Sequence, residues 1–205
     1  MIDIYKYEKE LKLKGYKLIC GTDEAGRGPI AGPVVAAAVI LDEHKKIDGL
    51  NDSKKLTATK RDKLYAEINE KALAVGISVV EAEEIDEINI LEASRKAMAL
   101  AIENLKVKPD YILSDYMDLS IYTEIPFLSL TNGDNLSASI AAASIIAKVK
   151  RDYLMVEYSK KYEGYGFEEH KGYPTKKHLK LIEEKGLTPI HRKSYKPVKK
   201  YQNIY

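Results

Sequence analysis

The stretch that decides the fold is "GTDEAGRGPIAGPVVAAAVIL", Gly21–Leu41. It places two adjacent acids, Asp23 and Glu24, shortly before the apolar run "GPVVAAAVIL". That run is too uniformly apolar to face water on either side, so it predicts a strand buried between two layers. Residues 16–22 predict another strand, ending at the acid pair. Carboxylates in such a place are costly unless they are paired or bound to a metal.

Outward from this stretch, hydrophobic periodicity predicts alternating helices and strands. Three further strands are expected in "AVGISVVEA", "YILSD" and "IPFLSL". Helices are expected over residues 1–15, 57–74, 84–106, 136–162 and 175–185, with a loop at 164–174 and an irregular basic tail. Thr57 is a plausible N-cap for the second of these helices. This order predicts an α/β fold, with a mixed five-stranded sheet flanked by helices. We expect a core over residues 1–150 and a helical, basic C-terminal segment, 151–205, packed on it as part of a single domain.

Composition places the chain in the globular class. Of its 205 residues, 45% are apolar and 31% are charged, which does not fit a disordered protein. No apolar run reaches the roughly 20 residues that span a bilayer, and the charged start "MIDIYKYEKELKLKG" lacks the apolar centre of a signal peptide. The single cysteine, Cys20, excludes an internal disulfide. We therefore expect a cytoplasmic protein without membrane contact, and a monomer by default.

Charge is unevenly distributed along the chain. Residues 150–205 hold 14 lysines and arginines against 7 acids, together with 8 of the 15 tyrosines. Basic residues interleaved with aromatic residues suit a sugar–phosphate backbone. A solvated helix face with tyrosines packed at its edge explains the pattern equally well.

Further acids fall where predicted strands end. Asp115 ends "YILSD", and Asp134 follows "IPFLSL" in the turn "TNGDN". Strand ends form the usual ligand crevice of such sheets, and if the first and fourth strands are neighbours, Asp23 and Asp115 lie side by side. Carboxylates at such a short distance stay ionised together only around a cation. Oxygen ligands favour Mg²⁺ or Mn²⁺ as that cation. His170 and His178 do not have a zinc-binding spacing.

Each acid also has a plainer interpretation. Asp134 can cap the following helix, Asp115 can begin a turn, and Asp118 is an alternative to Asp115 for a metal. Asp152 is expected to form local ion pairs in its helix. Successive strand residues point to opposite faces, so a bend must begin at Asp23 if Glu24 is to reach the same ion.

Several other residues could contact nucleic acid. Gly26 and Gly28 either permit a turn or let a polymer backbone approach closely, with Arg27 on a phosphate. Lys54 and Lys55 in "NDSKKL" lie in a solvated loop or contact phosphates. Tyr173 in "HKGYPT" can stack on a sugar or base, or pack against its own loop.

Four motifs together carry a family resemblance. The segments "GTDEAGRGPIAGPVVAAAVIL", "LNDSKKLT", "GDNLSASIAAASIIAKVKRD" and "HKGYPTKKH" resemble the ribonuclease HII (type 2 ribonuclease H) family over residues 17–198. The resemblance implies a ribonuclease H-like core and hydrolysis of the RNA strand of RNA/DNA hybrids. It also implies cleavage at ribonucleotides embedded in duplex DNA, leaving 3′-hydroxyl and 5′-phosphate ends, in the service of replication and repair.

The resemblance also assigns roles to particular residues. It implies two Mg²⁺ or Mn²⁺ ions about 4 Å apart, held by Asp23, Glu24, Asp115 and Asp134, with Asp23 bridging them. The implied substrate contacts are Gly26, Arg27, Gly28, Lys54, Lys55, Lys148 and Tyr173. Tyr116 stands where the family often has a small residue, which would crowd Asp115.

Two other functions fit the residues themselves. A related two-metal nuclease, for instance one that resolves DNA junctions, would cut all-DNA substrates. A non-catalytic module that binds hybrids or RNA would need no metal. The tail at residues 201–205 is either a partner-binding peptide or a frayed end.

Overall fold

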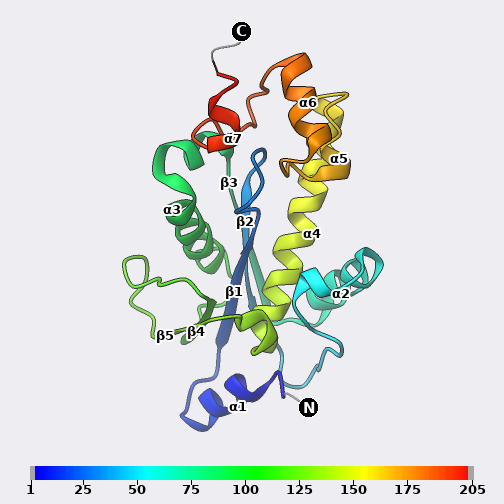
Figure 1. Ribbon diagram of the computed structural model, residues 1–205. Helices are drawn as coiled ribbons and strands as arrows, with labels where there is room; N and C mark the ends of the chain where they lie inside the picture. The colour runs from blue at the N-terminus through cyan, green and yellow to red at the C-terminus, as the bar shows by residue number, and fades with distance from the viewer. Residues whose placement is uncertain (1–2, 203–205) are drawn as a thin grey trace.

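A mixed five-stranded sheet forms the centre of the computed structural model, which describes residues 3–202 (Figure 1). The strand order is β3-β2-β1-β4-β5. β1 runs antiparallel to β2 and parallel to β4, β2 and β3 are antiparallel, and β4 and β5 are parallel. The strands are β1 (Ile19–Ala25), β2 (Val34–Ile40), β3 (Ala74–Val80), β4 (Tyr111–Asp115) and β5 (Phe127–Leu130). The predicted mixed sheet is confirmed.

Helices cover both faces of this sheet. In the part of the chain that the structure describes they are α1 (Lys6–Leu13), α2 (Ala58–Lys71), α3 (Ala82–Glu103), α4 (Ala138–Lys161), α5 (Phe167–His170), α6 (Lys176–Lys185) and α7 (Lys196–Lys199), with short 3₁₀ turns η1 (Ser53–Lys55) and η2 (Gly133–Asn135). α3 packs on one face and α4, backed by α2, on the other (Figure 1). Along β2, Ala36 and Ala38 pack on the α3 side, whereas Ala37 and Val39 pack on the α4 side. The prediction of a strand buried on both faces is therefore confirmed.

Local sequence signals set the starts of α2, α4 and α6, each of which begins after a side-chain N-cap. The Thr57 hydroxyl accepts a hydrogen bond from the N–H of Lys60, as expected of an N-cap, and Thr175 caps α6 in the same way. Two short helices interrupt segments that were expected to be irregular. α5 forms inside the predicted loop because its Phe167 side chain is fully buried beside Tyr165, and α7 forms where Val198 is buried.

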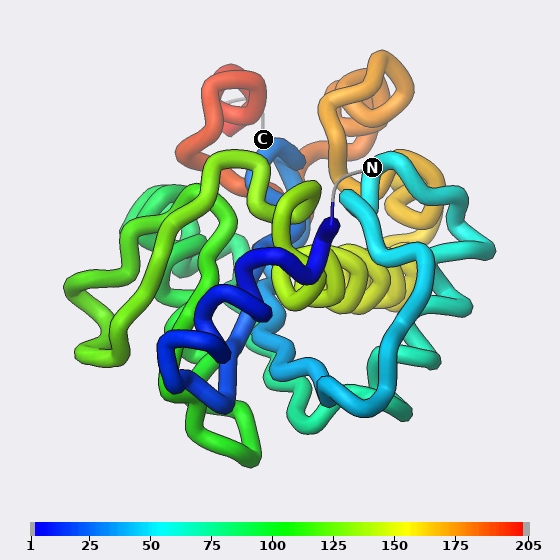
Figure 2. Tube along the Cα trace, turned by 90° about the horizontal axis from the view of Figure 1, so that it is seen from below, coloured from blue at the N-terminus to red at the C-terminus, as the bar shows by residue number. Residues whose placement is uncertain are grey.

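The C-terminal segment packs against the loop that precedes β2. Ala31 contacts a cluster containing Met155 and Phe167, and Ile30 contacts one containing Ile182 and Val198. Figures 1 and 2 show α5, α6 and α7 at one end of the sheet and α1 at the other, beside the start of α4. Residue 150 lies within the continuous helix α4. Residues 203–205, part of the tail considered above, lie outside the described residues, and so do residues 1–2 of the predicted first helix.

No helix in residues 3–202 has the length and apolar content needed to cross a membrane.

Candidate active site

The acid pair lies inside β1 rather than after it. β1 stays paired with β2 as far as Ala25 opposite Val35, so the prediction that the strand ends at the acid pair is wrong. The first turn of α4 lies directly against β1: a Cβ on Gly21 would lie 2.1 Å from the carbonyl carbon of Ser139. Only glycine permits this approach, which brings the start of α4 onto β1 beside the acids.

Three carboxylates from distant parts of the chain meet at the end of the sheet. Asp23, Asp115 and Asp134 each offer one oxygen, and these oxygens lie within 4.8 Å of one another. Asp115 follows the paired residues Thr22 and Ser114 by one position, and its Oδ1 accepts a hydrogen bond of 2.7 Å from the N–H of Gly133. That bond ties the end of β4 to η2, which carries Asp134.

The cluster is electrostatically strained when it holds no cation. Burial raises the pKa of Asp23 well above its usual range, and the charges of Glu24, Asp115 and Asp134 raise it further. Burial, with the neighbouring charges of Asp52 and Asp115, raises the pKa of Asp134 to about 6. Burial also raises the pKa of Asp115, although the N–H of Gly133 acts against it. Such shifts are typical of carboxylates arranged to share a cation.

Glu24 lies beside the three-acid cluster rather than within it. Its Oε1 lies 3.6 Å from the Arg27 guanidinium, while its Oε2 is buried without a hydrogen-bond partner. Burial raises the pKa of Glu24 to about 7, despite the opposing charge of Arg27, and the charge of Asp115 contributes. A buried, unpartnered carboxylate oxygen beside three other acids fits a cation ligand.

Asp118 lies outside the cluster. It is exposed and accepts a hydrogen bond of 2.9 Å from the N–H of Ser120, so it behaves as a turn residue. Tyr116 has a φ of 62° and is 64% exposed, so its ring extends into solvent while Asp115 faces the other acids. The expected crowding at this position is therefore avoided.

The three lysines singled out in the sequence differ in their surroundings. Burial opposes the charge of Lys54, but the carboxylates of Asp52, Asp23 and Asp134 outweigh it and raise the Lys54 pKa. Lys55 donates to the side-chain oxygen of Asn135 in η2. Lys148 is held by Asp152 at 2.7 Å, which confirms the local ion pair expected of Asp152. The charge of Lys54 is thus coupled electrostatically to the acid cluster.

Sequence reasoning missed Asp52. Its Oδ1 accepts a hydrogen bond from the N–H of Lys54 and caps η1, and its charge acts on both Asp134 and Asp115. The available signal was its place in "NDSKKL", where an acid directly precedes the lysines.

The glycine-rich loop and Tyr173 lie together. Gly26 has a φ of 106°, and a Cβ there would lie 2.2 Å from Nε of Arg151. A Cβ on Gly28 would lie 3.4 Å from Cε1 of Tyr173, so the 45% exposed Tyr173 ring borders this loop. Residues more than a hundred positions apart therefore share one surface.

A chain of neutral histidines supports the Tyr173 loop. The N–H of Thr188 donates to Nδ1 of His191, which leaves the proton of His191 on Nε2, 3.0 Å from Nε2 of His178. Nδ1 of His178 then carries a proton and donates to the carbonyl of Tyr173 at 2.9 Å. Because the nitrogens of His178 and His191 are occupied in this way, the two side chains hold the backbone of the loop in place.

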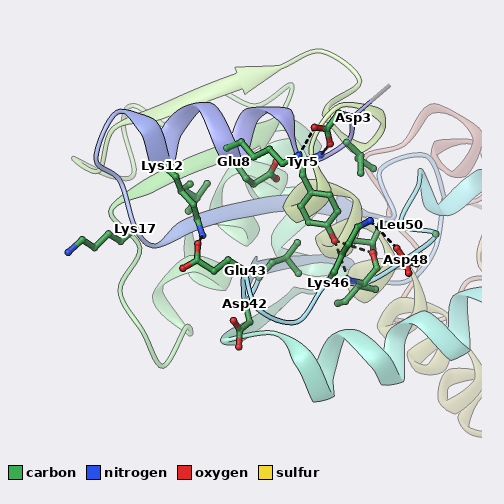
Figure 3. Close-up of a pocket in the computed structure, with 16 residues that line it drawn as sticks. Asp3, Tyr5, Glu8, Lys12, Lys17, Asp42, Glu43, Lys46, Asp48 and Leu50 are labelled. Atoms are coloured by element: carbon green, nitrogen blue, oxygen red, sulfur yellow. Dashed lines mark hydrogen bonds and ion pairs between the residues drawn. The ribbon is translucent and has the colours of Figure 1, made fainter. Parts of the chain in front are cut away.

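A separate hollow of about 730 Å³ lies between α1 and the loop after β2 (Figure 3). Lys12 and Glu43 form an ion pair at this hollow, and none of the residues predicted to act on a substrate lines it. Glu8, which does line it, accepts hydrogen bonds from Ser137 and Ser139. It thereby fixes the start of α4 at its N-cap Ser137, three residues after Asp134.

Comparison with known proteins agrees with this arrangement. The family model described as ribonuclease HII matches residues 20–198. A ribonuclease HII from Acholeplasma laidlawii is 57% identical over 97% of both chains. One from Bacillus licheniformis is 55% identical over 96% of this chain and 76% of its own.

A solved structure shares the fold. The crystal structure of ribonuclease H2 from Pyrococcus horikoshii OT3 superposes with a TM-score of 0.79 at 28% identity, covering 91% of this chain and 97% of that one. Fold, acid cluster and sequence identity point to the same group of enzymes. The chain therefore belongs to the ribonuclease HII family and is an endonuclease of the ribonuclease H type.

Proposed function

We propose that this chain cleaves the RNA strand of RNA/DNA hybrids and the DNA strand at single embedded ribonucleotides, using two divalent cations, Mn²⁺ or Mg²⁺. The observation that carries the proposal is the meeting of Asp23, Asp115 and Asp134 in a member of the ribonuclease HII family. Ligands drawn from β1, β4 and η2 come together only in the folded chain.

The donor set fits hard cations. Asp23, Asp115 and Asp134 supply converging oxygens, and Glu24 supplies a buried Oε2 without a partner. Asp23 is the natural shared ligand, because its carboxylate is subject to the charges of all three other acids. Bound cations of this kind activate water and stabilise the charge that develops on a phosphodiester. The four carboxylates hold the cations, and no serine or cysteine nucleophile is required.

The neighbouring surface fits the substrate. Arg27 is half exposed and extends from the loop that borders Tyr173, while Lys54 adds positive charge next to the acids. We assign phosphate contacts to Arg27, Lys54, Lys55 and Lys148, and contacts with the ribose to Gly26, Gly28 and Tyr173. A protein distinguishes RNA from DNA at one position through the 2′-hydroxyl, and backbone N–H groups of the loop beside an aromatic ring can make that contact.

One labelled 20-base-pair duplex tests the proposal in three forms: an RNA/DNA hybrid, a DNA duplex with one ribonucleotide, and an all-DNA duplex. The first two should be cut with Mn²⁺ or Mg²⁺ and left intact with EDTA, giving 5′-phosphate and 3′-hydroxyl ends. Equal cutting of all three forms would assign the chain to the DNA nucleases. Binding of the hybrid without cleavage under any metal condition would make it a binding module.

A further inference from the structure

Two arginines are fully buried beneath the glycine-rich loop at residues 26–33. Arg151 is 1% exposed and Arg192 is 0% exposed. Their guanidinium groups donate to main-chain carbonyl oxygens instead of carboxylates. Burying a guanidinium is costly, and such groups are retained where their hydrogen bonds fix a structure.

Arg192 holds two successive carbonyls of the loop. Its Nη2 donates to the Gly26 oxygen at 2.6 Å and its Nη1 to the Arg27 oxygen at 3.1 Å, while its Nε reaches Gly32 at 2.9 Å. The Tyr195 hydroxyl also donates to the Arg27 oxygen, at 2.9 Å, and accepts from Nη1 of Arg192. The first two peptide units of the loop are thus fixed from inside the protein.

This arrangement determines where the loop's N–H groups point. In a planar trans peptide the C=O and N–H bonds point in opposite directions, and the described chain contains no cis peptide. Since the carbonyls of Gly26 and Arg27 point toward Arg192, the N–H groups of Arg27 and Gly28 point away from it. Within residues 3–202 neither N–H has a hydrogen-bond partner. Two adjacent free donors therefore lie beside the Tyr173 ring.

We propose that Arg192 is a positioning residue for ribonucleotide recognition: it turns the N–H groups of Arg27 and Gly28 outward, toward the ribose and its phosphate. This inference rests on the proposed function, in which the loop and Tyr173 contact the ribonucleotide. Arginine is required because its planar fork of five N–H donors reaches three carbonyls in fixed directions. Lysine would keep the charge but lose that geometry.

Two variants and one matched control test the role. Arg192→Lys keeps the charge, and Tyr195→Phe removes the hydroxyl that donates to the Arg27 oxygen and accepts from Arg192, while keeping the partly buried ring. Val198→Ala is the control, because Val198 is fully buried in α7, packs in one cluster with Ile30 and Tyr195, and has no side-chain hydrogen-bonding group. For each protein we would measure melting temperature, kcat and KM on the single-ribonucleotide duplex, and Ki for the all-DNA duplex as competitor.

We expect Arg192→Lys to lower kcat/KM about tenfold or more and Tyr195→Phe about threefold, because misaligned hydrogen bonds to substrate are worth factors of this size. The Ki of the all-DNA duplex should stay within about twofold, because phosphate contacts dominate that binding. Val198→Ala should lower the melting temperature and change neither kcat/KM for the single-ribonucleotide duplex nor Ki for the all-DNA duplex.

Specific outcomes overturn the inference. Wild-type kcat/KM in both Arg192→Lys and Tyr195→Phe would remove Arg192 from recognition, and so would an equal loss in Val198→Ala. If Arg192→Lys fails to fold, Tyr195→Phe decides alone. A wild-type protein that does not cut the single-ribonucleotide duplex would instead refute the proposed function, which separates the two failures.

Discussion

Asp23 and Asp115 lie side by side on the parallel strands β1 and β4, each one residue beyond the paired positions Thr22 and Ser114. Their carboxylate oxygens come within 4.8 Å of each other and of Asp134. Two ionised carboxylates at such a distance repel each other by roughly 3 kcal/mol at an effective dielectric constant near 20. The metal-free cluster therefore lowers the stability of the fold. A bound cation relieves this repulsion, which favours cation binding at the cluster.

Asp23→Asn should separate catalysis from stability. We expect cleavage to fall at least about a thousandfold, because the shared ligand is lost, while hybrid affinity falls less than about threefold. The metal-free protein should become more stable by roughly 1–3 kcal/mol, because an uncharged amide avoids the cost of holding a buried acid beside Glu24, Asp115 and Asp134. Cleavage assays, binding titrations and urea unfolding measure the three quantities. Asp118→Asn is the matched control, and full activity in Asp23→Asn would exclude Asp23 from the mechanism.

Metal affinity should rise with pH between about 5 and 8. The pKa of Asp134 is raised to about 6 and that of Glu24 to about 7, so both bind protons in the metal-free site that a cation must displace. Calorimetric titration of Mn²⁺ in two buffers of different ionisation enthalpy measures the protons released. We expect protons to be released when Mn²⁺ binds near pH 6, and fewer protons to be released in Glu24→Gln. Affinity independent of pH over this range would contradict the raised pKa values.

Tyr173→Ala should lower cleavage at a single ribonucleotide more than it lowers duplex affinity. The ring borders Gly28 and is 45% exposed, so it is available to stack on a sugar. We expect about a tenfold loss of kcat/KM, largely restored in Tyr173→Phe. Tyr153→Ala removes a ring of similar exposure, 50%, on α4 and should have little effect. Equal losses of cleavage and affinity would assign Tyr173 to general binding.

Gly26→Ala should destabilise the protein more than Gly15→Ala. Both glycines have a positive φ, 106° and 100°, so both substitutions carry a backbone cost of about 1 kcal/mol. A Cβ on Gly15 meets open space, whereas one on Gly26 would lie 2.2 Å from Arg151. We expect Gly26→Ala to be at least about 2 kcal/mol less stable than Gly15→Ala in urea unfolding. Equal stability would show that the loop can move away from Arg151.

Acid should weaken the support of the Tyr173 loop. Burial lowers the pKa of His178 to about 3 and that of His191 to about 4, below the ordinary 6.5 that applies in the unfolded chain. Their contribution to stability is therefore complete above about pH 6.5 and is lost as the pH falls toward 4. At pH 5 one such histidine lowers the free energy of unfolding by about 2 kcal/mol relative to neutral pH.

Comparing wild type with His191→Gln separates the histidine effect from that of the carboxylates. The raised carboxylate pKa values act in the opposite direction, because they favour the folded state at low pH. Urea unfolding of wild type and His191→Gln at pH 7.5 and pH 5.0 should show a smaller acid-induced loss in the variant. The same loss in both would mean that His191 does not titrate with unfolding.

The sequence by itself was sufficient to predict the sheet and its buried strand. "VVAAAVI" offers no polar position, so β2 had to be covered on both faces, as Ala36 and Ala37 are by α3 and α4. Asp115 was placed at a strand end by the apolar residues before it. The end of β1 was misplaced, because glycine and small residues leave this segment without a periodic pattern, and pairing with β2 continues the strand to Ala25.

Only the tertiary structure decided which side chains meet. That Asp23 lies next to Asp115 depends on β4 being inserted beside β1, and hydrophobic periodicity carries no information on strand order. The burial of Arg192 is equally invisible in the sequence, because its partners at Gly26 and Arg27 lie more than 160 positions away. A charged side chain is stable inside a protein only where the fold supplies its hydrogen bonds, and those partners exist only once the chain has folded.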